Sequence, residues 1–315
     1  MKVAVIGCGG WGKNLVRNFH SLNALHSICD PNENLAFQIS KTYNVDSLKF
    51  QEILESSVEG VVISSPAKFH YDLSIQALKS KKHVFVEKPL SMNIPQANSM
   101  IKEAKINKRK LMVGHLLQYH PIFRKLLELK KSDRFGKVRL IYSNRLSFGK
   151  VRNEENVLWS FGPHDISMVL SLINSKVKNV RSFGSSILQK KILDESQIDI
   201  DFMNGARAKI KNSWISPFKE HKLTLIGDKA MAVFDDTKDW NEKLLIMDYK
   251  FSAKKNTLNL EANKKKFIKV PFSEPLKEEC MHFLEIMKNK KENITDGFEG
   301  KKVVEILERA SKALR

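Results

Sequence analysis

Four glycines stand close together near the start of the chain, in the run Gly7-Cys-Gly9-Gly10-Trp-Gly12. The run fits the pattern G-x-G-x-x-G, in which glycines permit a tight turn and let a pyrophosphate approach backbone N–H groups closely. A predicted strand, Val3 to Ile6, precedes the turn, and a predicted helix follows it. This context indicates a dinucleotide-binding turn, and the residues expected to contact the dinucleotide are Gly7, Gly9, Gly10, Trp11 and Gly12.

An acidic residue, Asp30, follows the second predicted strand, His26 to Cys29, and stands eighteen residues after Gly12. A carboxylate at this place accepts hydrogen bonds from the hydroxyl groups of an adenine ribose and repels a ribose phosphate. The spacing therefore predicts NAD, rather than NADP, as the cofactor.

Up to about residue 120, the sequence alternates continuous apolar runs with amphipathic helical stretches. This pattern predicts an α/β fold, a doubly wound parallel sheet of the Rossmann type with helices on both faces. We expect an NAD-binding domain over residues 1–120. Further elements expected in it are a helix over 15–22, a strand over 60–64, a helix over 73–78 and a strand over 83–86.

From about residue 136, polar and apolar residues alternate, which is typical of antiparallel strands with one buried face. We therefore expect residues 121–315 to form an α+β domain for substrate binding and oligomerisation, with a large, mainly antiparallel, open-faced sheet. Its elements are expected as strands over 138–142, 198–202, 206–210, 221–225 and 243–247, and as helices over 163–173, 276–288 and 300–313. The lysine-rich stretch 250–266 is expected to be a loop.

The run Glu87-Lys88-Pro89 directly follows the strand expected over 83–86. Open α/β sheets bind their ligands at the carboxyl ends of the strands. A lysine at that edge can donate a hydrogen bond to a hydroxyl or carbonyl oxygen beside a nicotinamide, so Lys88 is a candidate for chemistry.

Several segments together resemble the Gfo/Idh/MocA family of nicotinamide-dependent oxidoreductases. They are the glycine turn, Asp30, Val61-Val-Ile-Ser-Ser-Pro66 with His70, and His83-Val-Phe-Val-Glu-Lys-Pro-Leu90. The resemblance extends over essentially the whole chain and implies that Lys88 lies in the active site, near substrate and nicotinamide. The cofactor-site residues that it implies are Ser65, Pro66, His70, Glu87, Lys88 and Pro89.

The family places an acid/base histidine on a helix of the second domain, commonly four residues after an aspartate. In Leu158-Trp-Ser-Phe-Gly-Pro-His164-Asp165 the resemblance gives this role to His164, and Ser160 stands where many members carry aspartate. Apart from the resemblance, Pro163 suits the first position of a helix, where the helix dipole favours a neutral imidazole that can accept a proton. Asp165 is the competing base, but one helical step rotates it about 100° away.

Two segments resemble the branch of the family that acts on nucleotide-linked sugars, Gly114-His-Leu-Leu-Gln-Tyr-His-Pro121 and Trp214-Ile-Ser-Pro-Phe-Lys-Glu-His-Lys222. In the second, Lys219 and Lys222 are candidate phosphate partners, with the forked guanidinium of Arg145 as an alternative. Packing in the fold, or a solvated charge, is the competing interpretation for each of these residues. The residues expected to bind substrate are His115, Tyr119, His120, Arg145, Trp159, Ser160 and Lys219.

The resemblance implies oxidation of a secondary alcohol on the hexose of a nucleotide sugar, with carbon 3 of UDP-N-acetylglucosamine as the expected position. His164 would remove the hydroxyl proton and Lys88 would polarise the developing carbonyl, without a metal. The expected partner is a downstream aminotransferase that acts on the 3-keto product, toward amino sugars of surface polysaccharide or lipid A.

Three alternatives remain for the function. A 3-ketoreductase of dTDP-hexoses would prefer NADPH and often carries tyrosine at the position of His164. An inositol-type polyol dehydrogenase would carry aspartate at the position of Ser160. A non-catalytic sensor of NAD or of a nucleotide sugar would need neither Lys88 nor His164.

The amino-acid composition limits the classes of protein to which this chain can belong. The 54 Lys and Arg against 35 Asp and Glu give a net charge of +19, but the lysines form short runs without a nucleic-acid-binding motif, so no nucleic-acid partner is expected. No apolar run approaches the roughly 20 residues of a membrane span. Three scattered cysteines and a start that leads directly into the glycine turn predict a cytoplasmic protein. The half-exposed sheet predicts a homodimer or homotetramer.

Overall fold

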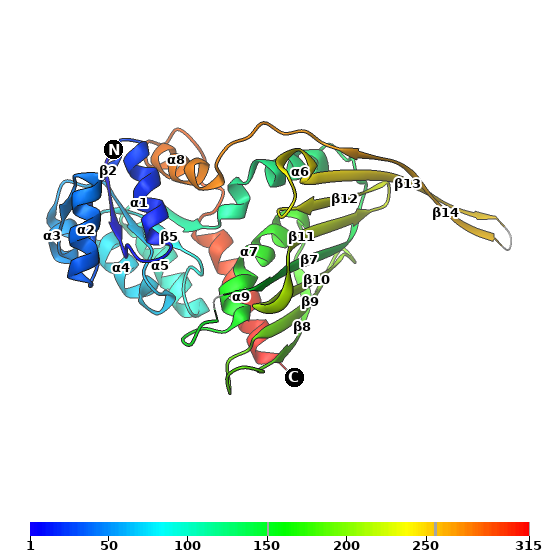
Figure 1. Ribbon diagram of the computed structural model, residues 1–315, viewed down its shortest axis with the longest axis horizontal. Coiled ribbons are helices and arrows are strands. Elements are labelled where there is room, and N and C mark those ends of the chain that lie inside the picture. The colour runs from blue at the N-terminus through cyan, green and yellow to red at the C-terminus, as the bar shows by residue number, and fades with distance from the viewer. Residues whose placement is uncertain (150, 255–256, 315) are drawn as a thin grey trace. The chain divides into compact units, whose positions relative to one another are not determined.

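The computed structural model describes residues 1–149, 151–254 and 257–314. The chain forms two compact units (Figure 1). Unit 1 comprises Met1–Tyr119 and Ser273–Glu305, and unit 2 comprises His120–Phe272 and Ile306–Arg315. The expected division at residue 120 is close to the first boundary. The C-terminal helices differ from the expectation, because a segment that follows unit 2 in the sequence returns to unit 1.

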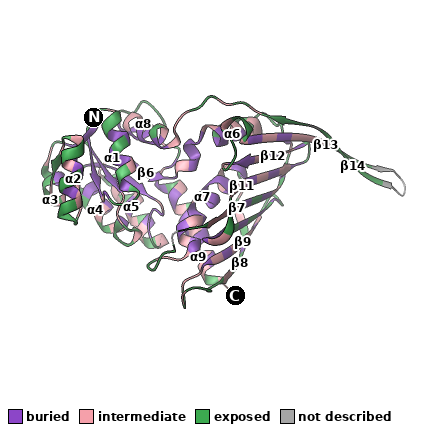
Figure 2. Cartoon of the chain, in the orientation of Figure 1, coloured by how far each residue is buried: buried purple, intermediate pink, exposed green. Residues whose placement is uncertain are grey.

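Unit 1 contains a parallel sheet of six strands, and every pair of neighbouring strands is parallel. In spatial order the strands are β3 (Asp46–Ser47), β2 (Leu25–Cys29), β1 (Val3–Ile6), β4 (Gly60–Ile63), β5 (His83–Glu87) and β6 (Leu111–Gly114). The central strands are apolar and buried on both faces, as their purple ribbons in Figure 2 show. The doubly wound Rossmann prediction is confirmed.

The helices of unit 1 cover this sheet and include one from the C-terminal region. They are α1 (Gly12–Ser21), α2 (Glu33–Tyr43), α3 (Phe50–Glu55), α4 (His70–Lys79), α5 (Ile94–Ile106) and α8 (Pro275–Met287). Phe283 of α8 packs against Phe19 of α1 and Phe85 of β5, with ring centroids 6.4 and 5.6 Å apart. Aromatic pairs at such distances stabilise beyond the apolar area that they bury. This contact explains why α8 belongs to unit 1.

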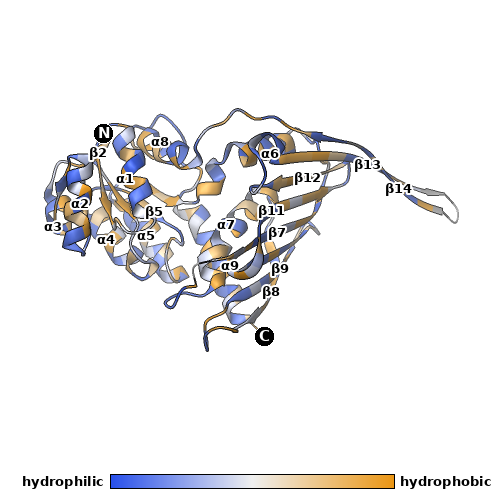
Figure 3. Ribbon diagram, viewed as in Figure 1, coloured by the Kyte–Doolittle hydropathy of each residue, from blue (hydrophilic) through white to orange (hydrophobic). Residues whose placement is uncertain are grey.

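Unit 2 is built on a sheet of eight strands in which only the pair β7 and β10 is parallel. Its spatial order is β14 (Thr257–Phe267), β13 (Leu244–Lys254), β12 (Ala230–Asp235), β11 (Ile215–Gly227), β7 (Val138–Phe148), β10 (Arg207–Ser213), β9 (Glu195–Phe202) and β8 (Val177–Ser185). Along β9 and β10, buried residues alternate with more exposed ones, and both colours of the hydropathy scale follow these strands in Figure 3. The mainly antiparallel sheet is confirmed.

Three helices complete the chain: α6 (Pro121–Lys131), α7 (Val157–Leu172) and α9 (Gly297–Lys312). The first part of α9 belongs to unit 1 and its end to unit 2. No helix within the described ranges combines the length and the apolar composition needed to cross a bilayer.

The sequence-based expectation of a loop over residues 250–266 was wrong, because the described residues 250–254 and 257–266 belong to the paired antiparallel strands β13 and β14. In β13 and β14, Phe251 pairs with Leu260, and Lys250 pairs with Glu261. The apolar positions thus share one side of the ribbon and the polar positions share the other. The high lysine content of this stretch led to the expectation of a loop, although its apolar and polar residues alternate. The strands β13 and β14 extend well beyond the neighbouring strand β12 (Figure 1).

The predicted start of the helix that carries His164 was also wrong. The helix α7 begins at Val157, and the side chain of Asn156 caps it by accepting a hydrogen bond from the N–H of Trp159. Pro163 therefore lies inside the helix, where it has no N–H to donate to the preceding turn. His164 lies beyond the first turn, so the helix-dipole argument for its neutral form does not hold.

Candidate active site

The glycine turn after β1 has a backbone that excludes other residues at two positions. Gly7 has a φ of +86°, and a Cβ atom on Gly12 would lie 1.9 Å from the carbonyl oxygen of Gly7. The chain itself therefore requires glycine at both places. At Gly9 and Gly10, by contrast, a Cβ atom would meet no protein atom within 4 Å.

The space above Gly9 and Gly10 lies at the start of α1, where backbone N–H groups favour an anion. Two buried hydroxyl oxygens of the neighbouring loop, Ser64 Oγ and Ser65 Oγ, have no hydrogen-bond partner among the described residues. Open space over glycines together with unused hydroxyl groups fits the pyrophosphate of a dinucleotide. Ser64 was not predicted, although it stands beside Ser65 in the same run.

Asp30 lies directly after β2 and is held in place by the backbone. Its Oδ2 accepts the N–H of Cys8 at 2.7 Å, and its Oδ1 accepts the N–H of Asn32 at 2.9 Å. Each carboxylate oxygen can accept a second hydrogen bond. The glycine turn thus fixes the orientation of Asp30 and leaves it able to accept the hydroxyl groups of a ribose.

We expect Asp30→Ser to lower the preference for NAD over NADP by about 10²-fold, because the variant loses both a charge-assisted hydrogen bond and the repulsion of a ribose phosphate. Calorimetric titration with each cofactor measures the preference. Asp30→Asn separates the charge from the geometry of the turn, and Asp46→Ser on the exposed strand β3 is the matched control. An unchanged preference for NAD over NADP in Asp30→Ser would mean that another residue distinguishes the ribose hydroxyl groups from a ribose phosphate.

Glu87 ends β5 and is buried beneath the glycine turn. Its Oε1 accepts the indole N–H of Trp11 at 2.7 Å. Burial raises the pKa of Glu87, while Trp11 and Lys88 lower it. A Cβ atom on Gly114 would lie 2.9 Å from this carboxyl group, so the glycine leaves the room that Glu87 occupies. The hydrogen bond between Trp11 and Glu87 therefore joins the glycine turn to β5, the strand that directly precedes Lys88.

His70 connects the loops that follow β4 and β5. Its Nδ1 lies 2.8 Å from the carbonyl oxygen of Pro89, and its Nε2 lies 2.9 Å from the carbonyl oxygen of Ser65. The side chain is 1% exposed, so these contacts of His70 with the two loops are buried. His70 thus fixes the position of one loop relative to the other. Pro66 precedes a short 3₁₀ turn in the first of these loops.

A second buried carboxyl group of unit 1, Glu279 on α8, was not predicted. It is fully buried, and neither of its oxygens has a hydrogen-bond partner among the described residues. Burial raises its pKa well above the ordinary value, and the charge of Glu87 raises it further. A signal did exist in the sequence, since Glu279 falls between Leu276 and Phe283 on the apolar side of the helix.

We expect Glu279→Gln to reduce the loss of stability as the pH rises from about 5 to 8. Because the pKa of Glu279 is higher in the folded state, its stabilisation is complete below the unfolded pKa of about 4.3 and is lost as the pH rises toward the folded pKa. Each unit of pKa difference corresponds to about 1.4 kcal/mol. Urea unfolding across this pH range measures the effect. Glu278→Gln, one residue earlier on the helix, should follow the wild-type curve, and identical slopes for all three proteins would contradict the assignment.

The segment after β6 places two predicted substrate residues inside unit 1. Tyr119 is 1% exposed, and its hydroxyl group lies 2.9 Å from Thr295 Oγ1. His115 is equally buried and contacts Glu299 through Nδ1. These two side chains therefore hold the start of α9 and the residue Thr295 before it within unit 1, which is the packing alternative and differs from the expected exposure to a ligand.

His120 also has structural partners, in unit 2. Its Nδ1 accepts the N–H of Ile122 at the start of α6, and its Nε2 lies 3.3 Å from Asp236. The ring stacks on Trp240 with centroids 5.5 Å apart. The pKa of Asp236 is lowered, because the bonds from His120 and Lys243 outweigh its burial. His120 thus secures α6 to the sheet.

The centre of unit 2 is a buried hydrogen-bond group around Asp165. Arg145 Nε donates to Asp165 Oδ2 at 2.8 Å, and Ser143 Oγ donates to Oδ1 at 2.7 Å. Asn212 Nδ2 donates to Oδ2 at 3.2 Å. Asp165 is therefore occupied as an acceptor and positions Arg145. This leaves its neighbour His164, which is less buried, as the acid/base candidate of α7.

Two further predicted residues lie on α7. Ser160 is buried, and the indole N–H of Trp159 donates to Ser311 Oγ of α9 at 3.0 Å. Trp159 thus links α7 to the C-terminal helix. Their proposed contacts with substrate stay predictions.

His221 on β11 was not predicted, although it lies in the segment that ends at Lys222. It pairs in the sheet with Arg145. Burial and, to a smaller extent, the charges of Arg145 and Lys219 together lower its pKa to about 4, against smaller opposite effects of Asp165 and Asp236. His221 is therefore neutral at pH 7, and the cations beside it affect its pKa more than the carboxylates do. Lys219 is exposed, and Lys222 forms ion pairs with Glu220 and Asp235.

The structure therefore brings the predicted residues together in two groups. In unit 1 the residues predicted to bind the cofactor lie at the carboxyl edge of the parallel sheet. In unit 2 the residues of α7 lie against β7, β10 and the end of α9.

Comparison with known proteins shows the family to which the chain belongs. Residues 1–115 match the model of the oxidoreductase family Gfo/Idh/MocA with its NAD-binding Rossmann fold, and residues 123–233 match a C-terminal domain of the same family. The chain is 24% identical to myo-inositol 2-dehydrogenase of Thermotoga maritima over 76% of each chain. It is also 24% identical to UDP-N-acetylglucosamine 3-dehydrogenase of Acidithiobacillus ferrooxidans, over 75% of this chain and 74% of that protein.

The solved structure of the latter enzyme superposes with a TM-score of 0.89 at 20% identity, over 100% of this chain and 97% of that one. At this identity the structural likeness establishes a shared fold.

Proposed function

Because the chain belongs to the Gfo/Idh/MocA family of NAD-binding oxidoreductases, we propose that it oxidises a secondary alcohol on the hexose of a nucleotide-linked sugar. Carbon 3 of UDP-N-acetylglucosamine is the proposed position. When bound, NAD accepts the hydride from this carbon. The product is the corresponding 3-keto sugar.

The observation that supports the substrate class is the pair of cationic side chains beside His221, Arg145 on β7 and Lys219 on β11. Arg145 and Lys219 outweigh the nearby carboxylates at His221. A nucleotide sugar carries a dianionic diphosphate, which such a surface attracts. The net charge of +19 acts in the same direction.

The residues of this chain are proposed to manage the proton and the developing carbonyl. His164 accepts the proton of the hydroxyl group, and Lys88 donates a hydrogen bond to the oxygen as the carbonyl forms. Asp165 holds Arg145 by two hydrogen bonds, at 2.8 and 3.4 Å, in position for the anionic part of the substrate. An aminotransferase is the proposed consumer of the 3-keto product, and a homodimer or homotetramer is the proposed assembly.

A second candidate is oxidation of a free polyol of the inositol type. The specific observation in its favour is that an inositol dehydrogenase is as similar in sequence as the nucleotide-sugar enzyme. Ser160 counts against it, because this buried hydroxyl replaces the carboxylate expected there.

The test is the absorbance of reduced nicotinamide after mixing the protein with NAD and a panel of UDP-sugars, dTDP-sugars and myo-inositol. A 3-aminotransferase with an amino donor is added to remove the product. A signal with UDP-N-acetylglucosamine alone would support the proposal. A signal with myo-inositol alone would select the second candidate. Silence with every compound, with calorimetry showing intact NAD binding, would favour a non-catalytic sensor.

A further inference from the structure

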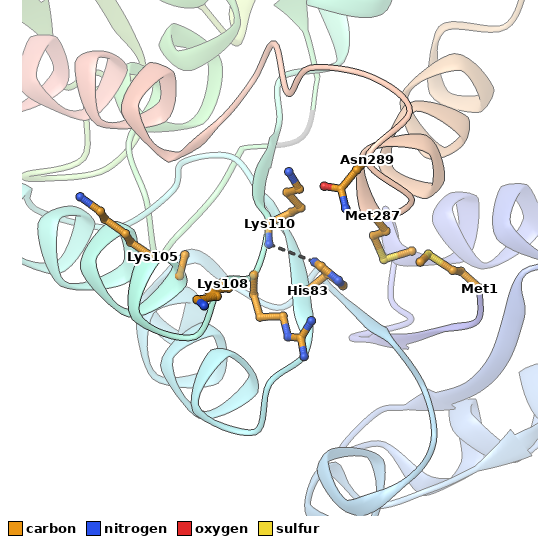
Figure 4. A pocket seen from close by; sticks show the side chains of 9 residues that line it. Met1, His83, Lys105, Lys108, Lys110, Met287 and Asn289 are labelled. Carbon is orange, nitrogen blue, oxygen red and sulfur yellow. Dashed lines mark hydrogen bonds between the residues drawn. The ribbon is translucent and has the colours of Figure 1, made fainter.

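A hollow of about 640 Å³ lies at the amino-terminal edge of the parallel sheet in unit 1, where β5 and β6 begin (Figure 4). The glycine turn and Asp30 lie at the opposite, carboxyl edge. Side chains from the start of β5, from the connection between α5 and β6, and from the end of α8 line the hollow. It is therefore separate from the cofactor site.

The lining is strongly basic and contains no carboxylate. Its four cationic side chains are Lys105, Lys108, Arg109 and Lys110. None of them forms an ion pair with another described residue, whereas the lysines of unit 2 around Asp236 and Asp235 do. Cations gathered around a space without acidic partners repel one another and attract an anion.

The helix dipole explains only part of this cluster. Lys105 lies in the last turn of α5, where a cation is favourable. Lys108, Arg109 and Lys110 follow the end of the helix, and Lys82 adds a further buried cation nearby, held by the carbonyl oxygens of Ser56 and Val58.

His83 and Arg109 provide hydrogen-bond donors. The N–H of Lys110 donates to His83 Nδ1 at 3.0 Å, as the dashed line in Figure 4 shows, so the neutral ring carries its proton on Nε2. Burial and, to a smaller extent, the charges of Arg109 and Lys110 together lower the pKa of His83 to about 4, while Glu59 acts in the opposite direction. The Nε of Arg109 is buried and has no hydrogen-bond partner among the described residues.

We propose that this hollow binds a small phosphate-bearing anion. A phosphate group accepts hydrogen bonds from a guanidinium and from several ammonium groups at once, which matches the donors present. The side chains of Met287 and Ala104 offer an apolar wall to an organic part of the ligand, and the volume is that of a small-molecule site. A bound anion would join β5, β6 and α8, and would thereby stabilise unit 1.

The test uses the full-length protein saturated with NAD, so that the glycine turn is already filled. Inorganic phosphate, pyrophosphate and glucose 6-phosphate are titrated by calorimetry against sodium chloride of equal ionic strength, and the His83 ring is followed by NMR. We expect saturable binding and a rise of the His83 pKa from about 4, because the anion offsets the neighbouring cations. Tighter binding of glucose 6-phosphate than of inorganic phosphate would identify an ester, and the reverse order would identify an inorganic anion.

Matched variants separate this site from the general charge of the protein. The triple variant Lys105→Ala, Lys108→Ala, Lys110→Ala keeps the backbone N–H that holds His83 and should weaken binding by about tenfold or more. The variant Lys176→Ala, Lys178→Ala, Lys190→Ala removes the same charge from exposed positions of unit 2 and should bind as the wild type does. Three results would overturn the proposal: no small phosphate moves the His83 signal, both triple variants lose affinity equally, or only an RNA oligonucleotide binds.

Discussion

Lys88→Met is expected to lower kcat by about 10²- to 10³-fold, the usual cost of removing one donor to a developing oxyanion. NAD affinity should remain nearly unchanged, because the glycine turn, Asp30 and the Ser64–Ser65 loop are formed without the lysine side chain. Methionine preserves the length of the side chain and removes its charge and its donors. Stopped-flow absorbance gives kcat, and calorimetry gives the affinity for NAD.

Two controls define this result. Lys79→Met, at the exposed end of α4, removes the same charge from unit 1 and should leave kcat at the wild-type value. Lys88→Arg restores charge but not the shape of the ammonium group, so partial activity is expected. A wild-type kcat in Lys88→Met would show that the lysine takes no part in the mechanism. A loss of NAD affinity that accompanies the loss of kcat would show that the lysine binds the cofactor instead.

His164→Ala is expected to lower kcat by about 10²- to 10⁴-fold, the contribution of a positioned acid/base group. The acidic limb of the pH profile of kcat should disappear, because the group that must be deprotonated is gone. The profile measured with a nucleotide sugar between pH 5 and pH 9 checks this. The residue next to it, Asp165, cannot take over, since it already accepts hydrogen bonds from Arg145, Ser143 and Asn212.

His221→Ala is the matched control in the same unit. The pKa of His221 is lowered to about 4, so this ring stays neutral over the measured range and produces no limb between pH 5 and pH 9. The variant should keep the wild-type shape of the pH profile of kcat. If the acidic limb disappeared in His221→Ala and persisted in His164→Ala, the acid/base role would belong to β11 instead of α7.

Local patterns in the sequence were sufficient for much of the cofactor half. The strand, the glycine run and Asp30 lie within thirty residues, and each requirement arises from the backbone itself. Gly7 needs a positive φ, and Gly12 lies against the carbonyl oxygen of Gly7. Interactions of such short range are visible as residue type and spacing.

Two sequence-based predictions of secondary structure were wrong because the same residues are compatible with two local structures. Pro163 suits the first turn of a helix, but the helix begins six residues earlier, at Val157, where Asn156 caps it. The lysines of 250–266 suggested a loop, but their alternation with apolar residues was the pattern of a ribbon. In both cases a competing signal a few residues away decided the structure.

The sequence by itself determined the fold class, the cofactor turn and the existence of a second, sheet-based unit, because periodicity and glycine spacing are local properties of the chain. Only the tertiary structure decided that α8 packs on unit 1, that Asp165 is an acceptor for Arg145, and that Glu279 is a buried carboxyl group near Glu87. Each of these depends on residues far apart in the sequence, so burial and charge at such positions arise only when the chain has folded. An apolar helix face shows that something must cover it, and packing alone decides what does.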